Sequence, residues 1–184
     1  MRNSYMMRVL RSTTLLGAMT LTVAACGGDY ANLSSLAPAK KNFVATLVGT
    51  SEVPAVTTTA AGKMELVQED SVNIVYTITT TARTDSITMA HIHAAAAAGT
   101  NGPIMVWFFP SEAARAPGTG GGTAAAVTGV VRVGRITRAG TSFVAPFTWD
   151  SLLVRMNAGT AYANIHTRRF GGGEIRGQVA PAAQ

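Results

Sequence analysis

The stretch VNIVYTITTT, residues 72–81, is dominated by β-branched side chains. Such residues favour extended backbone, because their side chains pack well on the pleated surface of a sheet. At residues 43–48 (FVATLV), the side chains of Phe43, Ala45 and Leu47 occupy every second position. Alternation with a period of two predicts strands that bury one face. We therefore expect the chain to consist mainly of β-strands.

About nine such strands are predicted, separated by Gly, Pro, Asn and Asp residues that favour turns. They cover residues 43–48, 63–68, 72–81, 86–93, 104–109, 130–137, 142–148, 161–167 and 174–179. The run IMVWFF at 104–109 is apolar throughout, so we expect burial on both of its faces. Helical signals are weak, with a turn or two of helix expected at 151–157. The pattern predicts an all-β fold, an antiparallel Greek-key β-sandwich or barrel of eight or nine strands, immunoglobulin-like or superoxide-dismutase-like.

The first 25 residues have the composition of a secretory signal. Arg2, Arg8 and Arg11 supply its positive charge, and residues 13–25 are uncharged, with apolar and small side chains. This run is too short and wrongly flanked for a membrane-spanning helix. We therefore expect residues 1–25 to be removed on export.

Cys26 is the single cysteine of the chain, so no disulfide can form within it. The sequence Val23-Ala24-Ala25-Cys26 resembles a bacterial lipobox, which implies cleavage before Cys26 and its lipidation. The residue after Cys26 is Gly27 rather than Asp, so in a bacterium with two membranes the sorting pattern implies an outer-membrane anchor at the cell envelope. The predicted division is a signal peptide with lipobox at 1–25, a flexible tether at 26–41, a β domain at 42–180 and a tail at 181–184.

The charge distribution argues against nucleic-acid binding. The formal net charge is +6, but three of the 15 basic residues lie in the predicted signal peptide. The other basic residues are scattered rather than clustered with aromatic residues, so the electrostatic footprint of a nucleic-acid partner is missing.

All three histidines lie in two predicted strands. His91 and His93 belong to MAHIHAAAAAGTNGP (89–103), and residues i and i+2 of a strand point to the same face about 6.6 Å apart. Tyr162, Asn164 and His166 likewise share one face of AYANIHT (161–167). If these strands are neighbours, three imidazoles can meet at one metal ion, with Asn164 or Tyr162 orienting a ring. Three neutral imidazoles favour copper or zinc. The alternative is that the histidines only hydrogen-bond and pack within the sheet.

Four segments in this order resemble the CHRD (chordin) domain family, as found in bacterial lipoproteins. They are FVATLVGTSEVPAV (43–56), AHIHAAAAAGTNGPIMV (90–106), AYANIHT (161–167) and GGEIRGQV (172–179). The resemblance implies an extracytoplasmic all-β module. In chordin itself the domain is part of a protein that binds growth factors, whereas the family implies no established catalytic activity for bacterial members.

Glu174 and Arg176 share a strand face in the last of these segments, where opposite charges can pair with a neighbouring strand. We interpret them as a structural ion pair or hydrogen-bond lock. Glu52 is the expected partner of Arg176, because their two segments occur together in the family pattern. The turn at 100–103 (TNGP) is expected to need little beyond local turn chemistry and to bind no ligand.

The sequence contains no Gly-x-Ser-x-Gly elbow, phosphate loop or recognisable pair of catalytic carboxylates, so we expect that the protein is not an enzyme. A copper–zinc dismutase-like site would use more histidines than this chain has. The expected function is that of a lipid-anchored envelope module that binds an unknown protein or polymer through its loops. The alternative is a copper- or zinc-binding envelope protein that uses His91, His93 and His166.

Overall fold

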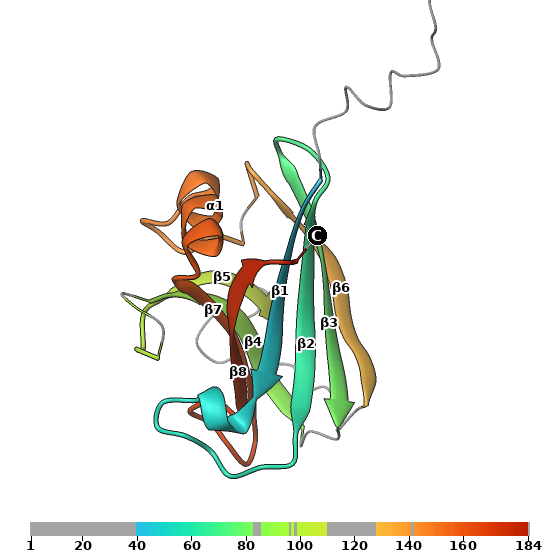
Figure 1. Cartoon of the computed structure of the whole chain (residues 1–184), viewed down its shortest axis with the longest axis vertical. Coiled ribbons are helices and arrows are strands. Elements are labelled where there is room, and N and C mark those ends of the chain that lie inside the picture. Colours follow the sequence, from blue (N-terminus) through green and yellow to red (C-terminus); the bar gives the residue numbers. More distant parts are fainter. Residues whose placement is uncertain are drawn as a thin grey trace, which may run out of the picture. The chain divides into compact units, whose positions relative to one another are not determined.

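The computed structural model describes residues 40–82, 86–95, 97, 99–109, 128–140 and 142–183. The predicted signal peptide, lipobox, Cys26 and nearly all of the tether lie outside these residues. The strands are β1 (Lys41–Val48), β2 (Ala61–Gln68), β3 (Asn73–Ala82), β4 (Ile87–Ala94), β5 (Ile104–Phe109), β6 (Gly129–Thr137), β7 (Ala161–Thr167) and β8 (Ile175–Pro181). The helices are the 3₁₀ turn η2 (Gly49–Ser51) and the α-helix α1 (Trp149–Ala158) (Figure 1).

The eight strands form one sheet in the order β5-β4-β7-β8-β1-β2-β3-β6. Every neighbouring pair is antiparallel. The pairs β8–β1, β4–β7 and β3–β6 join strands that are not consecutive in sequence, as a Greek-key chain path requires. The predicted all-β antiparallel fold with little helix is confirmed.

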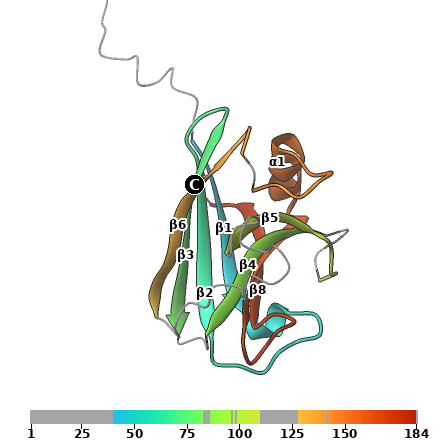
Figure 2. The ribbon, with the colours of Figure 1, turned by 180° about the vertical axis from the view of Figure 1, so that it is seen from behind.

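The sheet curls until it is nearly a closed barrel. Tyr76 of β3 and Phe108 of β5 belong to strands near opposite ends of the sheet order, yet their ring centroids lie 4.4 Å apart. Strand β4 lies behind β1 and β8 in Figure 1 and in front of them in Figure 2. The two halves of the sheet therefore face each other across a shared core.

That core consists of the inward-pointing side chains of both halves. Phe43, Met64, Leu66, Ile78 and Ile92 are each no more than 2% exposed. Burying one such side chain stabilises a fold by roughly 1.5–3 kcal/mol before chain entropy is subtracted. The IMVWFF run of β5 is buried at Met105, Val106, Trp107 and Phe108, which confirms the predicted burial on both faces.

The strand predicted at 142–148 is wrong. Only an isolated bridge between Val106 and Phe143 links this segment to the sheet. Pro146 has no N–H to donate to a ladder, and the Phe147 N–H closes a turn on the Val144 carbonyl at 2.9 Å. The segment therefore leaves the sheet and leads into α1.

Helix α1 begins two residues before the predicted 151–157 and ends one residue after it. Thr148 and Ser151 form a reciprocal capping box at its start, and Gly159 ends it in the left-handed conformation with φ +65°. Trp149, Leu152 and Met156 are buried in the core. None of the helices in the described part of the chain is long and apolar enough to cross a membrane.

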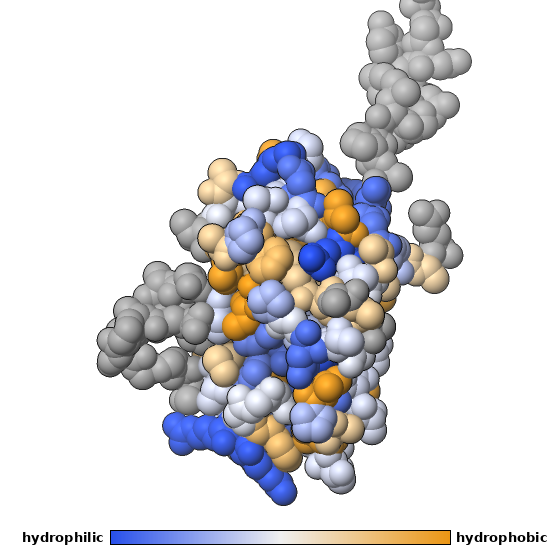
Figure 3. Space-filling view, turned by 90° about the vertical axis from the view of Figure 1, so that its left-hand side faces the viewer, coloured by the Kyte–Doolittle hydropathy of each residue, from blue (hydrophilic) through white to orange (hydrophobic). Residues whose placement is uncertain are grey.

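In the part of the chain that the structure describes, the exposed large apolar side chains are all valines. The large exposed ones are Val53, Val72, Val130, Val133 and Val154. On the face shown in Figure 3, hydrophobic residues are scattered among hydrophilic ones. Single exposed valines of this kind are normal in soluble domains.

Candidate metal centre

Strands β4 and β7 are neighbours, which places the three histidines together. In the β4–β7 register His91 lies opposite Asn164, His93 opposite Tyr162, and Met89 opposite His166. Successive residues of a strand point to opposite faces, so Ala90 and Ile92 enter the core while the histidines point to the other side of the sheet. The neighbouring strands that a shared metal site requires are therefore present.

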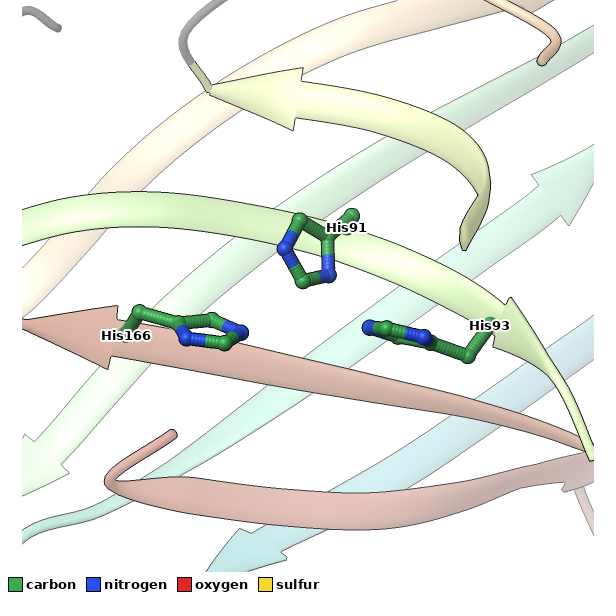
Figure 4. A group of neighbouring side chains, drawn as sticks. All are labelled: His91, His93 and His166. Atoms are coloured by element: carbon green, nitrogen blue, oxygen red, sulfur yellow. The ribbon is translucent and has the colours of Figure 1, made fainter. Parts of the chain in front are cut away.

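The three imidazoles converge on one point. The His91 ring centroid lies 4.5 Å from that of His93 and 4.6 Å from that of His166. One ring nitrogen from each of the three lies within 4.8 Å of the others. Figure 4 shows the rings of His93 and His166 facing each other from either side, with His91 between them. Bonds of 2.0–2.1 Å to a tetrahedral zinc ion separate two nitrogens by about 3.4 Å. The nitrogens would therefore have to approach one another by at most about 1.4 Å to bind such an ion.

Two carbonyl groups fix the tautomers of His93 and His166. The His93 Nδ1 lies 2.7 Å from the Gly102 oxygen, and the His166 Nδ1 lies 2.9 Å from the Gly171 oxygen. Because a carbonyl only accepts, each Nδ1 carries the proton and each Nε2 carries a lone pair. Both Nε2 atoms are buried and have no hydrogen-bond partner. This is the arrangement in which metal-bound histidines are typically held.

Burial keeps these imidazoles uncharged. Desolvation lowers the pKa of His93 to about 4, against a smaller opposite effect of its hydrogen bond to Gly102. Desolvation likewise lowers the pKa of His166, and the Gly171 hydrogen bond opposes it. The neutral imidazole is the form that binds metals, so both rings are ready to bind near neutral pH.

Aromatic and cationic groups support the histidine cluster. Tyr162 stacks on His93 with a centroid distance of 4.5 Å and an interplanar angle of 4°. The Arg176 guanidinium lies 3.4 Å from the Tyr162 ring centroid. His93 and Arg176 come from β4 and β8, on the two sides of β7, so they hold Tyr162 between them. Trp107 of β5 meets His91 edge-on at 4.6 Å.

The turn at 100–103 is part of this support, so the prediction that it needs little beyond local chemistry is wrong. Arg176 donates from Nη1 to Asn101 Oδ1 at 2.9 Å and from Nη2 to the Thr100 carbonyl at 2.6 Å. The Gly102 N–H donates to the Tyr162 hydroxyl at 3.2 Å. A Cβ at Gly102 would collide with the Ala94 carbonyl oxygen, so only glycine fits there.

Glu52, Glu174 and Arg176, the predicted lock, are all buried, but their contacts differ from a single ion pair. The hydrogen bonds of Arg176 run to the turn, and Glu174 Oε1 accepts one from Thr58 at 2.8 Å. The positive charge of Arg176 acts on Glu52 by lowering its pKa. Desolvation nevertheless raises the pKa of Glu52 to about 7, outweighing the lowering by Arg176 and by the Asn164 side chain.

Sequence reasoning did not identify Trp107, Asn101, Gly102 or Gly171 as parts of the centre. A turn-forming Asn-Gly pair has an ordinary local explanation, and backbone carbonyls leave no mark on a sequence. A separate cavity of about 700 Å³ lies between α1 and the β2–β3 turn and is lined by residues such as Gln68 and Leu153. It contains none of the histidines.

Comparisons with known proteins identify the family. No curated protein and no solved structure matches the chain. The family model of the CHRD domain matches residues 43–179, from β1 to β8, which includes the four segments that carried the predicted resemblance. The chain therefore belongs to the CHRD domain family.

Proposed function

We propose that this CHRD domain binds one transition-metal ion, copper or zinc, through His91, His93 and His166. The observation that carries the proposal is the convergence of three buried imidazoles whose ring nitrogens lie within 4.8 Å of one another. Ligation through His93 Nε2 and His166 Nε2 uses lone pairs that have no hydrogen-bond partner.

A purely structural role explains the cluster less well. A buried acceptor without a partner costs about 1–3 kcal/mol, and the cluster places two such atoms together. Core packing alone would be served better by apolar side chains of similar volume. An ion satisfies both lone pairs at once, which offsets the cost of holding polar rings inside the protein.

The donor set favours copper or zinc over harder ions. All three ligands are imidazole nitrogens, which suit zinc and copper, whereas calcium and magnesium prefer oxygen.

The proposed role is binding rather than catalysis. Trp107 and Trp149, whose exposure would have favoured a docking surface for a protein or polymer, are both buried. Binding of a protein or polymer partner through the loops stays a prediction.

The proposal places the metal-binding domain at the cell envelope, held by lipid on Cys26 and a flexible tether. The supporting observations are the lipobox-like Val23-Ala24-Ala25-Cys26 and the charged and apolar parts of the leader. The substitution Cys26→Ser in the full chain should release the protein from membranes into the soluble fraction. Continued membrane association of this variant would count against lipidation.

Metal analysis of protein purified without a histidine tag tests the centre. Metal-free protein is dialysed against Cu²⁺ or Zn²⁺, and bound metal is measured by mass spectrometry. We expect one ion per wild-type chain and none retained by the His91→Ala/His93→Ala double variant. The matched control is Glu65→Gln, which changes an exposed possible ligand on β2. Equal metal content in the wild type and the double variant would contradict the proposed metal site.

A further inference from the structure

The proposed centre has fewer protein ligands than its metal needs. The group of possible ligands within the described residues consists of His91, His93 and His166. Zinc in proteins is almost always four-coordinate and Cu²⁺ prefers tetragonal geometry, so a centre with three protein ligands keeps a position for water or another small molecule. What lies beside that position then decides what can enter it.

Asn164 is the polar side chain placed among all three imidazoles. It lies directly opposite His91 in the β4–β7 register and two residues before His166 on the same face of β7. Its side chain also interacts with that of His93. Asn164 is 3% exposed, and its Oδ1 is buried without a hydrogen-bond partner.

Two neighbouring acceptors cannot satisfy each other. Asn164 Oδ1 and His93 Nε2 both offer lone pairs, since the proton of His93 is on Nδ1 facing Gly102. A metal ion on Nε2 that carries a water satisfies both, because the water donates a hydrogen bond to Oδ1. The amide oxygen is a poorer ligand than imidazole for copper or zinc, so accepting from the water is its better role.

Glu52 favours this orientation of the amide. Above its pKa of about 7 the Glu52 carboxyl group is ionised, so it only accepts a hydrogen bond from the Asn164 side chain. The NH₂ group of Asn164 is therefore drawn to Glu52, and the oxygen is left for the side of the histidines.

We propose that the metal carries an exchangeable water in its fourth position, held by Asn164 Oδ1, and that small anions replace this water. The inference rests on the proposed metal-binding function and adds to it an open position with a defined neighbour. A small anion such as azide binds the metal through a lone pair and has no proton to give. Azide therefore has to break the bond between the water and Asn164 without replacing it.

Titration of the Cu²⁺-loaded protein with sodium azide tests the open position. We expect a saturable azide-to-copper charge-transfer band and a changed electron paramagnetic resonance spectrum. The copper-loaded Asn164→Leu variant should bind azide about three- to tenfold more tightly than the wild type, because its water has lost one hydrogen bond. Asn157→Leu, on the exposed face of α1, is the control and should behave as the wild type.

The outcomes separate the two proposals. Failure of the wild type to bind either copper or zinc removes the proposed function itself. Copper binding without any response to azide shows a closed site and overturns the open position alone. Unchanged or weaker azide binding in Asn164→Leu overturns the role of Asn164. Asn164→Asp covers the case in which the leucine variant does not fold. Its carboxylate repels the anion, so azide binding should weaken at least tenfold, and unchanged binding contradicts the proposal.

Discussion

The two halves of the sheet differ in how many faces they bury. In β2 and β3, of the half β1-β2-β3-β6, buried positions alternate with more accessible ones, and Lys63 and Glu65 reach solvent from β2. In the half β5-β4-β7-β8, all seven residues of β7 are buried. One face of β7 joins the apolar core, while the other carries Tyr162, Asn164 and His166.

This difference explains why the candidate centre lies where it does. A solvated strand face leaves its histidines hydrated and near their ordinary pKa, with little to orient them. A covered face removes water, lowers the pKa of His93 to about 4 and supplies carbonyl groups that fix the rings. A histidine would therefore have a different pKa and a differently fixed ring in the two halves of the barrel.

The largest expected effect is at Arg176, which holds the covered face together. Arg176→Met loses the hydrogen bonds to Asn101 and Thr100 and leaves Glu52 buried beside no positive charge. We expect the free energy of unfolding to fall by about 3–5 kcal/mol, measured by urea denaturation of the metal-free protein. Arg132→Met, on the exposed surface of β6, should change it by less than about 0.5 kcal/mol. Similar losses in both variants would contradict the comparison between the halves.

Two glycines that both hold a histidine through their carbonyl give the next prediction. Gly102→Ala places a Cβ against the Ala94 carbonyl, whereas a Cβ at Gly171 meets nothing within 4 Å. We expect Gly102→Ala to lower the free energy of unfolding by about 1–3 kcal/mol and to weaken metal binding, because the His93 ring loses its fixed position. Gly171→Ala should have little effect on either. Isothermal titration with Zn²⁺ and thermal unfolding compare the two. Equal behaviour would show that the turn does not orient His93.

The pH dependence of the metal-free protein gives the third prediction. The Glu52 pKa rises from 4.5 to about 7 on folding, so between these values the unfolded chain releases a proton that the folded chain keeps. Glu52 therefore reduces stability as the pH rises from 4.5 to 7. Glu52→Gln lacks this loss and should gain stability relative to the wild type across that window, as measured by denaturation at several pH values.

His93 gives stability the opposite dependence on pH. Its pKa falls from 6.5 to about 4 on folding, so the unfolded chain takes up a proton first as the pH decreases. His93 therefore reduces stability as the pH falls from 6.5 to 4, and His93→Gln should lose this dependence. Parallel pH profiles for the two variants would contradict the assigned environments.

The smallest effect is expected on the solvated half. Lys63 and Glu65 form an ion pair at 2.7 Å, but their side chains are 46% and 51% exposed. Water and salt screen such a pair, so Lys63→Ala should change the free energy of unfolding by less than about 0.5 kcal/mol. A loss above 1 kcal/mol in urea denaturation would show that this face is less solvated than its exposure indicates.

Features that depend on local interactions could be predicted from the sequence, whereas those that depend on contacts between distant segments could not. The alternation in FVATLV and the β-branched run at 72–81 determine strands locally, and β1 and β3 form where expected. The segment 142–148 was mispredicted because Phe143, Val144 and Phe147 have strand-like side chains, while its hydrogen bonds end after one bridge. Thr148 and Ser151, three residues apart, are the local signal for the helix start.

By itself the sequence determined an antiparallel β domain, its family and a shared strand face for His91 and His93, since these depend on local periodicity and on ordered motifs. Tertiary structure alone decided that β4 and β7 are neighbours and that His166 completes the cluster. It also decided that Arg176 binds a turn 75 residues away rather than forming a simple ion pair with Glu52. The physical reason is that strand order and the burial of a second sheet face arise from pairings between distant segments, which no local pattern encodes.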